Sequence, residues 1–167
     1  DDNDNPHIAY YDDTNGALKY ATNQGQFWDI TTIPAVSDNY GEYASLALDI
    51  DNNPYIAYLD KTNMILRLAS YDGSSWSSEV VSSQGQIGGQ CSLAITDEGD
   101  FFISYYSITN DSQMIARHRP NATSWSLTQV YTGGGMHTAI ATDDEGMPHV
   151  ASFDSSGDGW LVYSYIN

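Results

Sequence analysis

The stretch Pro6-His7-Ile8-Ala9-Tyr10-Tyr11-Asp12 decides the fold, because it returns three more times along the chain. The four copies begin at residues 6, 54, 101 and 148, so successive copies lie 48, 47 and 47 residues apart. They read PHIAYYD, PYIAYLD, FFISYYS and PHVASFD. Three further elements recur in the same order: small runs such as SLAL at 45–48, runs such as LKYA at 18–21, and runs that begin at Trp28, Trp76 and Trp125. Repetition at a fixed interval indicates a repeat architecture.

Each repeat holds four short runs rich in Ile, Val, Tyr and Thr, separated by turns rich in Asp, Asn and Gly. Such runs are typical of strands, and four strands per repeat are typical of a β-propeller blade. We therefore predict an all-β single domain, 1–167, with 14 strands in two full and two partial blades, whereas a β-sandwich would leave the repeat unexplained. The repeat units are approximately 1–38, 39–85, 86–132 and 133–167. We expect the innermost strand to be the small one, and the second strand, such as 54–60, to be covered on both faces.

Partial blades at both ends leave three expectations open. The chain is part of a longer polypeptide that completes the propeller, or it forms a small propeller, or several chains close a ring as a homo-oligomer.

The charge balance excludes several classes of partner. The chain has 22 acidic and 5 basic residues, a formal net charge of −17, so it lacks the cations that a polyphosphate would require and no nucleic acid is expected. No apolar run approaches the roughly 20 residues of a membrane span, so no membrane insertion is expected. Cys91 is the single cysteine, which excludes an internal disulfide or a multi-cysteine zinc site. The acidity is compatible with an extracellular or high-salt setting, and we expect the chain to be extracellular or at the cell surface. Two sequons predict glycosylation at Asn110 and Asn121.

The repeat unit, with its Pro-His-Ile-Ala-Tyr-Tyr-Asp, Leu-Lys-Tyr-Ala and Trp elements, resembles repeats of secreted and cell-surface β-propeller proteins of bacteria and archaea. It also resembles the sialidase-like propeller group, whose Asp-box turns read Ser/Thr-x-Asp-x-Gly-x-Thr-Trp. Residues 70–76, SYDGSSW, keep the Ser, Asp, Gly and Trp of that pattern but are one residue short. Residues 21–28, ATNQGQFW, have the full length with Asn in place of Asp. Because Asp-boxes are structural turns, the resemblance implies the fold and not the activity.

No catalytic residue is predicted. Sialidase-like hydrolysis would need three clustered arginines, whereas this chain has only Arg67, Arg117 and Arg119, the last two nearly adjacent on a third strand. Most carboxylates fall in turns, where they bond to nearby backbone amides. We therefore expect a protein that is not an enzyme, with a glycoside-hydrolase-like enzyme fragment as the most distant alternative.

Calcium is the one cofactor that the sequence suggests. Asp49, Asp51 and Asn53 place oxygen ligands at alternating positions, as loops that bind hard cations do. The same residues also suit an ordinary Asp/Asn turn between two strands.

A ligand site is predicted at one end of the innermost strands. Two sets of residues are expected on that face: the positions just before the innermost strand, Tyr43, Gln90 and His137, which follow the glycine column Gly41, Gly88 and Gly135, and the ends of the second strand, Asp12, Asp60 and Asp154. Aromatic rings beside Asp, Gln and His suit sugars, because sugars stack on rings and take hydrogen bonds from polar groups. The alternative is that Tyr43 packs on its own loop and the aspartates cap turns.

The sequence therefore predicts a non-catalytic extracellular or cell-surface propeller module for adhesion, recognition or assembly of an extracellular structure. Its expected partners are glycans or other surface proteins. A carbohydrate-binding propeller lectin is the alternative.

Overall fold

The computed structural model describes residues 1–154 and 159–166, and every regular element in them is a β-strand. No helix that could span a membrane is found in this part of the chain. The predicted all-β architecture with 14 strands is confirmed. The strands are β1 His7–Asp12, β2 Ala17–Thr22, β3 Asp29–Thr32, β4 Tyr40–Leu48, β5 Pro54–Asp60, β6 Ile65–Tyr71, β7 Trp76–Ser82, β8 Ile87–Ile95, β9 Phe101–Ser107, β10 Ser112–His118, β11 Ser126–Thr132, β12 Met136–Thr142, β13 Pro148–Asp154 and β14 Trp160–Tyr165.

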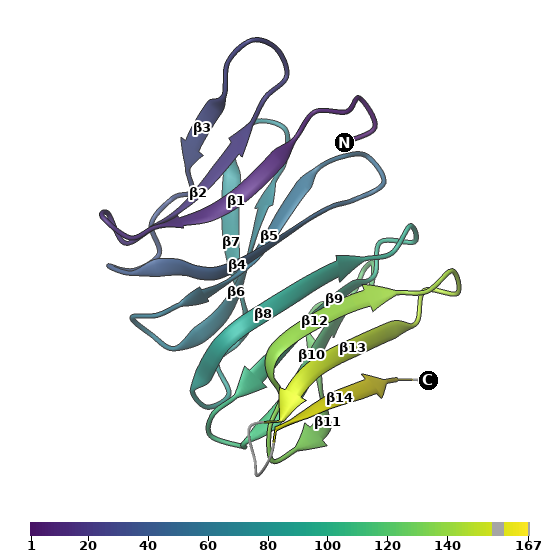
Figure 1. The fold of residues 1–167 in the computed structure, drawn as a ribbon. Helices are drawn as coiled ribbons and strands as arrows, with labels where there is room; N and C mark the ends of the chain where they lie inside the picture. Colours follow the sequence, from purple (N-terminus) through teal and green to yellow (C-terminus); the bar gives the residue numbers. More distant parts are fainter. Residues whose placement is uncertain (155–158, 167) are drawn as a thin grey trace.

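These strands form four antiparallel sheets in chain order: β1-β2-β3, β4-β5-β6-β7, β8-β9-β10-β11 and β12-β13-β14. We call them sheets 1 to 4. They follow one another in a row, from purple at the N-terminus to yellow at the C-terminus, with sheets 1 and 4 at opposite ends (Figure 1). Within each sheet, strands that follow one another in the sequence pair, because the connections between them are short turns that can join only antiparallel strands.

The innermost strands β4, β8 and β12 lie side by side and carry the small residues that the sequence predicts there. A serine hydroxyl links each of these strands to the next. The Leu93 amide donates to Ser45 Oγ at 3.0 Å, and the Ile140 amide donates to Ser92 Oγ at 3.1 Å. Small side chains let the strands approach closely enough for these bonds to form.

The core lies between successive sheets, and each junction uses the same register positions. We call the side of a sheet that faces the next sheet its forward face, and the opposite side its back face. At the first junction, the forward face of sheet 1 carries Leu18 and Tyr20, which are in one cluster with Ile56 and Tyr58 from the back face of sheet 2. At the second junction, Leu66 and Leu68 of sheet 2 are in one cluster with Ile103 and Tyr105 of sheet 3.

The third junction includes polar side chains. Gln113 on β10 is fully buried at a position where sheet 2 has Leu66. Its amide nitrogen donates to Thr138 Oγ1 at 3.1 Å, and its amide oxygen accepts from Ser152 Oγ at 3.0 Å. Because both ends of the amide are paired, burial leaves neither without a partner.

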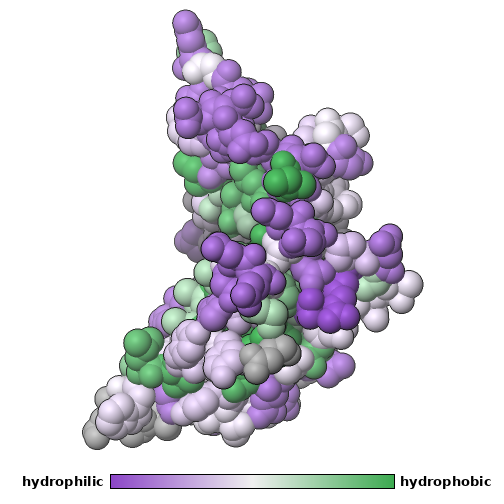
Figure 2. All heavy atoms as spheres, turned by 90° about the vertical axis from the view of Figure 1, so that its right-hand side faces the viewer, coloured by the Kyte–Doolittle hydropathy of each residue, from purple (hydrophilic) through white to green (hydrophobic). Residues whose placement is uncertain are grey.

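The strands β1 and β13 of the end sheets are not covered on both faces, contrary to the expectation for the second strand of each repeat. β5 and β9 are covered on both faces, whereas Ile8 and Tyr10 on β1 and Phe153 on β13 are exposed. The physical reason is the position of their sheets, since sheets 1 and 4 each have a neighbour on one side only (Figure 1). The surface that faces the right-hand side of Figure 1 is mostly hydrophilic, with hydrophobic residues in separate patches (Figure 2).

Candidate functional site

The three residues predicted before the innermost strands meet at one hollow. Tyr43 on β4, Gln90 on β8 and His137 on β12 line a cavity of about 310 Å³. The rest of its lining is Gly88, Gly89, Tyr106, Ile108 and Met136. We call this cavity the inner-strand hollow. It lies toward the beginning of these strands, whereas the turns that begin at Asp49 and Asp143 lie at their opposite ends.

Backbone bends set the positions of these side chains. Tyr43 and His137 have φ values of 56° and 53°, and Gly89 has a φ of 81°. All three lie in the left-handed region, which is uncommon for residues other than glycine and is found often at functional sites. Each bend interrupts the regular pairing of its strand with the next strand. Such irregularities re-aim side chains, which here converge on the hollow.

Gly88, a member of the glycine column, must be small because the Ile108 side chain approaches its backbone closely. A Cβ added to Gly88 would lie 2.2 Å from Ile108 Cγ1. Gly88 therefore lets the Ile108 side chain enter the wall of the hollow.

The hollow combines an apolar wall with two polar side chains. His137 Nδ1 and Gln90 Oε1 lie 2.7 Å apart, within hydrogen-bond distance. Tyr43 is 44% exposed, and no residue that lines the hollow is acidic or basic apart from the histidine. An exposed ring beside an amide and an imidazole can stack on an apolar ligand face and bond to hydroxyl groups. This chemistry suits a neutral, hydroxyl-rich ligand.

Cys91 lies directly behind the hollow. Its thiol donates to the Tyr43 carbonyl oxygen over 3.2 Å, and burial raises its pKa to about 12. At pH 8 the folded protein therefore holds Cys91 as a thiol, whereas the reactive form is the thiolate.

We expect iodoacetamide at pH 8 to leave Cys91 unmodified in the folded protein and to label it fully in denaturant. Mass spectrometry of both samples measures this difference. Labelling of the folded protein as fast as that of a free thiol would contradict the burial of Cys91.

The three predicted aspartates do not line the inner-strand hollow. Asp60 is fully buried and accepts from Ser37 Oγ at 2.8 Å and from Arg67 Nε at 3.0 Å. Asp12 accepts from the side-chain amide of Asn15 at 2.8 Å. Asp154 is buried and accepts from the Tyr131 hydroxyl at 2.6 Å. The first set, Tyr43, Gln90 and His137, thus lines the hollow. The aspartates of the second set instead accept hydrogen bonds from neighbouring side chains.

The predicted calcium turn is closed by its own side chain. Asp49 Oδ1 accepts the amides of Asp51 at 3.0 Å and Asn53 at 2.8 Å, and Asp49 Oδ2 accepts from Asn53 Nδ2 at 3.0 Å. Asp1 and Asp143 begin turns of the same kind. Among residues 1–154 and 159–166, no three His, Cys, Asp or Glu side chains form a metal cluster. Calcium binding by this turn stays a prediction.

Both predicted glycosylation sites lie in exposed turns. Asn110 follows β9, and Asn121 lies between β10 and β11 with a φ of 65°. The hydroxyl of Ser112, the third residue of the first sequon, is buried and donates to the Asn110 carbonyl oxygen at 2.7 Å. Glycosylation at either asparagine stays a prediction.

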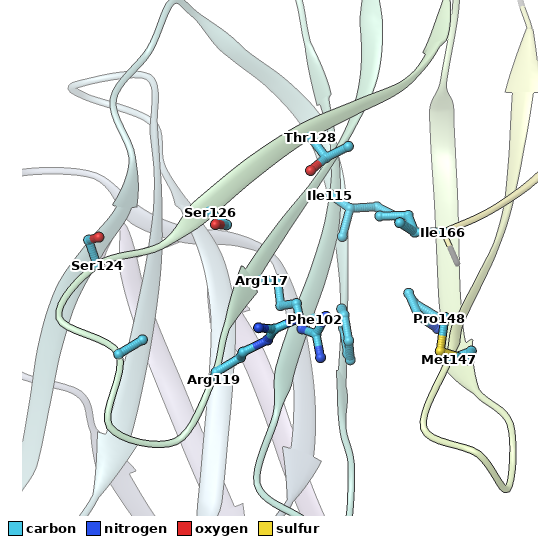
Figure 3. A pocket seen from close by; sticks show the side chains of 11 residues that line it. Phe102, Ile115, Arg117, Arg119, Ser124, Ser126, Thr128, Met147, Pro148 and Ile166 are labelled. Carbon is cyan, nitrogen blue, oxygen red and sulfur yellow. The ribbon is translucent and has the colours of Figure 1, made fainter.

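A second cavity, of about 290 Å³, lies between sheets 3 and 4. In Figure 3, Arg117 and Arg119 project from one wall, and Met147 and Pro148 lie on the opposite side. Arg117 is paired with Asp100 and stacks over the Phe102 ring at 4.9 Å. Arg117 is thus already engaged by a carboxylate, and the Arg119 guanidinium is the group that suits a carboxylate or sulfate of a ligand. This cavity was not predicted, although Arg117 and Arg119 are two of only five basic residues in the chain.

The earlier junctions carry a tryptophan near the corresponding place. Trp76 packs at the junction of sheets 1 and 2, and Trp125 packs at the junction of sheets 2 and 3. Each begins, or directly precedes, the fourth strand of its sheet. Sheet 4 has three strands in the described part of the chain, which accounts for the open space at the third junction.

Solved structures share this arrangement of sheets. AofleA from Arthrobotrys oligospora superposes with a TM-score of 0.70 at 14% identity, over 98% of this chain and 50% of that chain. The fold is of the β-propeller type. A protein of unknown function from Dyadobacter fermentans DSM 18053 gives 0.68 at 11% identity, over 98% and 56% of the two chains. The intramolecular trans-sialidase from Ruminococcus gnavus gives 0.63 at 12% identity, over 96% and 40%.

The likeness to a sialidase agrees with the resemblance to the sialidase-like propeller group. This propeller-type chain spans about half the length, or less, of these structures. No family model matches the sequence, and no curated protein matches it.

The turn that resembles an Asp-box is structural. Asp72 Oδ1 accepts the amides of Ser74 and Ser75, both at 2.8 Å. These hydrogen bonds, with that of the Ser74 hydroxyl, lower the pKa of Asp72 to about 2. Trp76 follows directly and packs beside Tyr71, with ring centroids 5.3 Å apart. The Asp72 carboxylate is therefore used to hold the turn itself.

Proposed function

We propose that this chain is a non-catalytic recognition module of the β-propeller type that binds carbohydrate in the inner-strand hollow. The observation that carries the proposal is the convergence of Tyr43, Gln90 and His137, from three strands about 47 residues apart in sequence, on one cavity. Likeness to a sialidase fold supports a carbohydrate-related role. We also propose that each sheet is one blade, two with four strands and two with three, and that the module acts outside the cell or at its surface.

The chemistry of the hollow favours neutral sugars over charged ligands. The Tyr43 ring offers a stacking surface, and the paired amide and imidazole offer donors and acceptors to hydroxyl groups. With a net charge of −17, the field of the whole protein opposes the approach of anions. A neutral monosaccharide unit meets no such barrier.

Binding to an array of neutral and acidic glycans tests the proposal. We expect a selective signal for neutral glycans that Tyr43→Ala and His137→Ala each weaken about tenfold or more, because an aromatic or polar anchor in a small site carries more than about 1.4 kcal/mol. Tyr10→Ala and His118→Ala are matched controls, since they remove the same residue types from outside the hollow. Thermal unfolding of each variant shows that it is folded.

Three outcomes would contradict this proposal. Undiminished binding by both hollow variants would exclude the hollow as the site. Binding that is lost instead in Arg119→Ala, for acidic glycans, would place the site in the cavity of Figure 3. Turnover of any bound glycan would favour an enzyme over a recognition module.

A further inference from the structure

The forward face of sheet 4 exposes side chains whose equivalents in the other sheets are buried. Leu161 and Leu66 occupy the same place in their sheets, opposite Phe153 and Leu59. Leu161 is 83% exposed, whereas Leu66 is fully buried. Tyr163 corresponds to Leu68 in the same way and is 62% exposed. Several exposed apolar side chains on one face of a sheet are typical of an interaction surface.

The back face of sheet 1 shows the complementary pattern. Ile8 is 45% exposed, whereas the equivalent residue of sheet 2, Ile56, is fully buried. Trp28 is 46% exposed, whereas Trp76, which holds the corresponding place in sheet 2, is partly buried and packs against the core cluster of the first junction. The two open faces therefore carry the two halves of a sheet-to-sheet junction.

The first junction shows how such halves fit together. There the Tyr20 ring on the forward face of sheet 1 meets the Trp76 ring at 5.0 Å between centroids. Tyr20 is held by His7, whose Nδ1 lies 2.5 Å from its hydroxyl oxygen. On the forward face of sheet 4, Tyr163 holds the place of Tyr20 and bonds to His149 in the same way. Sheet 4 thus presents the surface that accepts a tryptophan at the first junction.

The innermost strands indicate which sheet fits there. Ser45 and Ser92 each accept an amide from the next innermost strand, and the corresponding residue of sheet 4 is Ala139, which has no hydroxyl. Sheet 1 is formed by β1, β2 and β3 in the described residues, and none of these strands accepts or donates such a serine–amide bond. Sheet 1 of another copy therefore matches the forward face of sheet 4.

We propose that the forward face of sheet 4 binds the back face of sheet 1 of a second copy of this chain, head to tail. Trp28 of one copy then packs on Tyr163 of the other, as Trp76 packs on Tyr20 within one chain. Such an interface joins two different patches, so it leads to rings or to open chains of copies. Because every copy carries a net charge of −17, screening by salt strengthens the association.

Sedimentation velocity of the 167-residue chain between about 5 and 500 μM in 0.5 M NaCl tests the proposal, because this range covers dissociation constants in the micromolar region. We expect concentration-dependent growth beyond the 18.3 kDa monomer and weaker growth in 0.05 M NaCl. Leu161→Asp and Trp28→Asp are each expected to give monomers, because each removes one half of the junction. Both positions are exposed within a single copy, and circular dichroism checks that the variants fold.

An equimolar mixture of the two variants is the sharpest arm of the experiment. Each variant keeps the half that the other has lost, so the mixture is expected to form dimers and nothing larger. A wild-type chain that stays monomeric at every concentration would overturn the proposal. Self-association of either single variant, or a mixture that stays monomeric, would overturn the head-to-tail arrangement.

Discussion

Replacing Asp60 by alanine is expected to lower the free energy of unfolding by about 3–5 kcal/mol, the cost typical of breaking a buried ion pair from one side. The Asp60 carboxylate is fully buried and accepts from Ser37, Asn63 and Arg67. Its removal leaves the Arg67 guanidinium, also largely buried, without its anion. Urea unfolding of both proteins measures the loss.

The effect of Asp60→Ala is also expected to depend on pH. Burial alone would raise the pKa of Asp60, but the hydrogen bonds from Asn63, Ser37 and Arg67 together lower it below its usual 3.8. A lowered pKa contributes stability above about pH 4, and this contribution is lost as the pH falls through the folded-state pKa. The difference between the two proteins should therefore shrink below pH 4.

Asp12→Ala is the matched control for Asp60→Ala, because Asp12 holds the same place in sheet 1. Its partners are Asn15 and Lys19, and its side chain is 21% exposed, whereas that of Asp60 is fully buried. We expect a much smaller loss of stability. Equal losses in the two variants would contradict the role assigned to burial.

Replacing Gly135 by alanine is expected to cost about 2–4 kcal/mol of stability, from overpacking together with backbone strain. Gly135 has a φ of 111°, and a Cβ there would lie 2.4 Å from Gln113 Cβ and 2.7 Å from Gln113 Cα. Since Gln113 belongs to the buried polar network of the third junction, it has little room to move. Thermal and urea unfolding measure the loss.

Gly133→Ala separates the two causes. Gly133 also has a positive φ, 82°, but a Cβ there would meet nothing within 4 Å. We expect this control to lose about 1 kcal/mol, the strain alone. Equal losses at both positions would show that close approach to Gln113 is not what requires glycine. Gly135→Ala should also weaken glycan binding, because it displaces His137 two residues later.

Much of the fold could be predicted because the repeat fixes the register. Once residues 6–12, 54–60, 101–107 and 148–154 are aligned, the turns and the order of strands follow from composition alone. The exposure of Ile8 and Phe153 could not be read in the same way, because equivalent residues look alike in sequence. Whether such a residue is buried depends on the presence of a neighbouring sheet, which the pattern within one repeat does not contain.

Three residues of the site could be predicted because the repeat also fixes where equivalent side chains lie. Tyr43, Gln90 and His137 converge because their shared register places them at one end of neighbouring strands. The use of Asp60 as a buried partner of Arg67 was missed. A signal for it existed, since Asp12 and Lys19 also form a pair and also lie seven residues apart. Tyr106 and Ile108 were missed because they reach the hollow from the end of β9, outside the aligned column.

The inner-strand hollow is shared by three strands, so it is a property of the junctions and not of any one sheet. In the described part of the chain, β4, β8 and β12 build one such hollow. A single copy is then monovalent for the ligand proposed above, and its affinity is limited by one shallow contact. Copies joined end to end would present several hollows at fixed spacing, and the effective concentration of each for a polymeric glycan would raise avidity without any new contact.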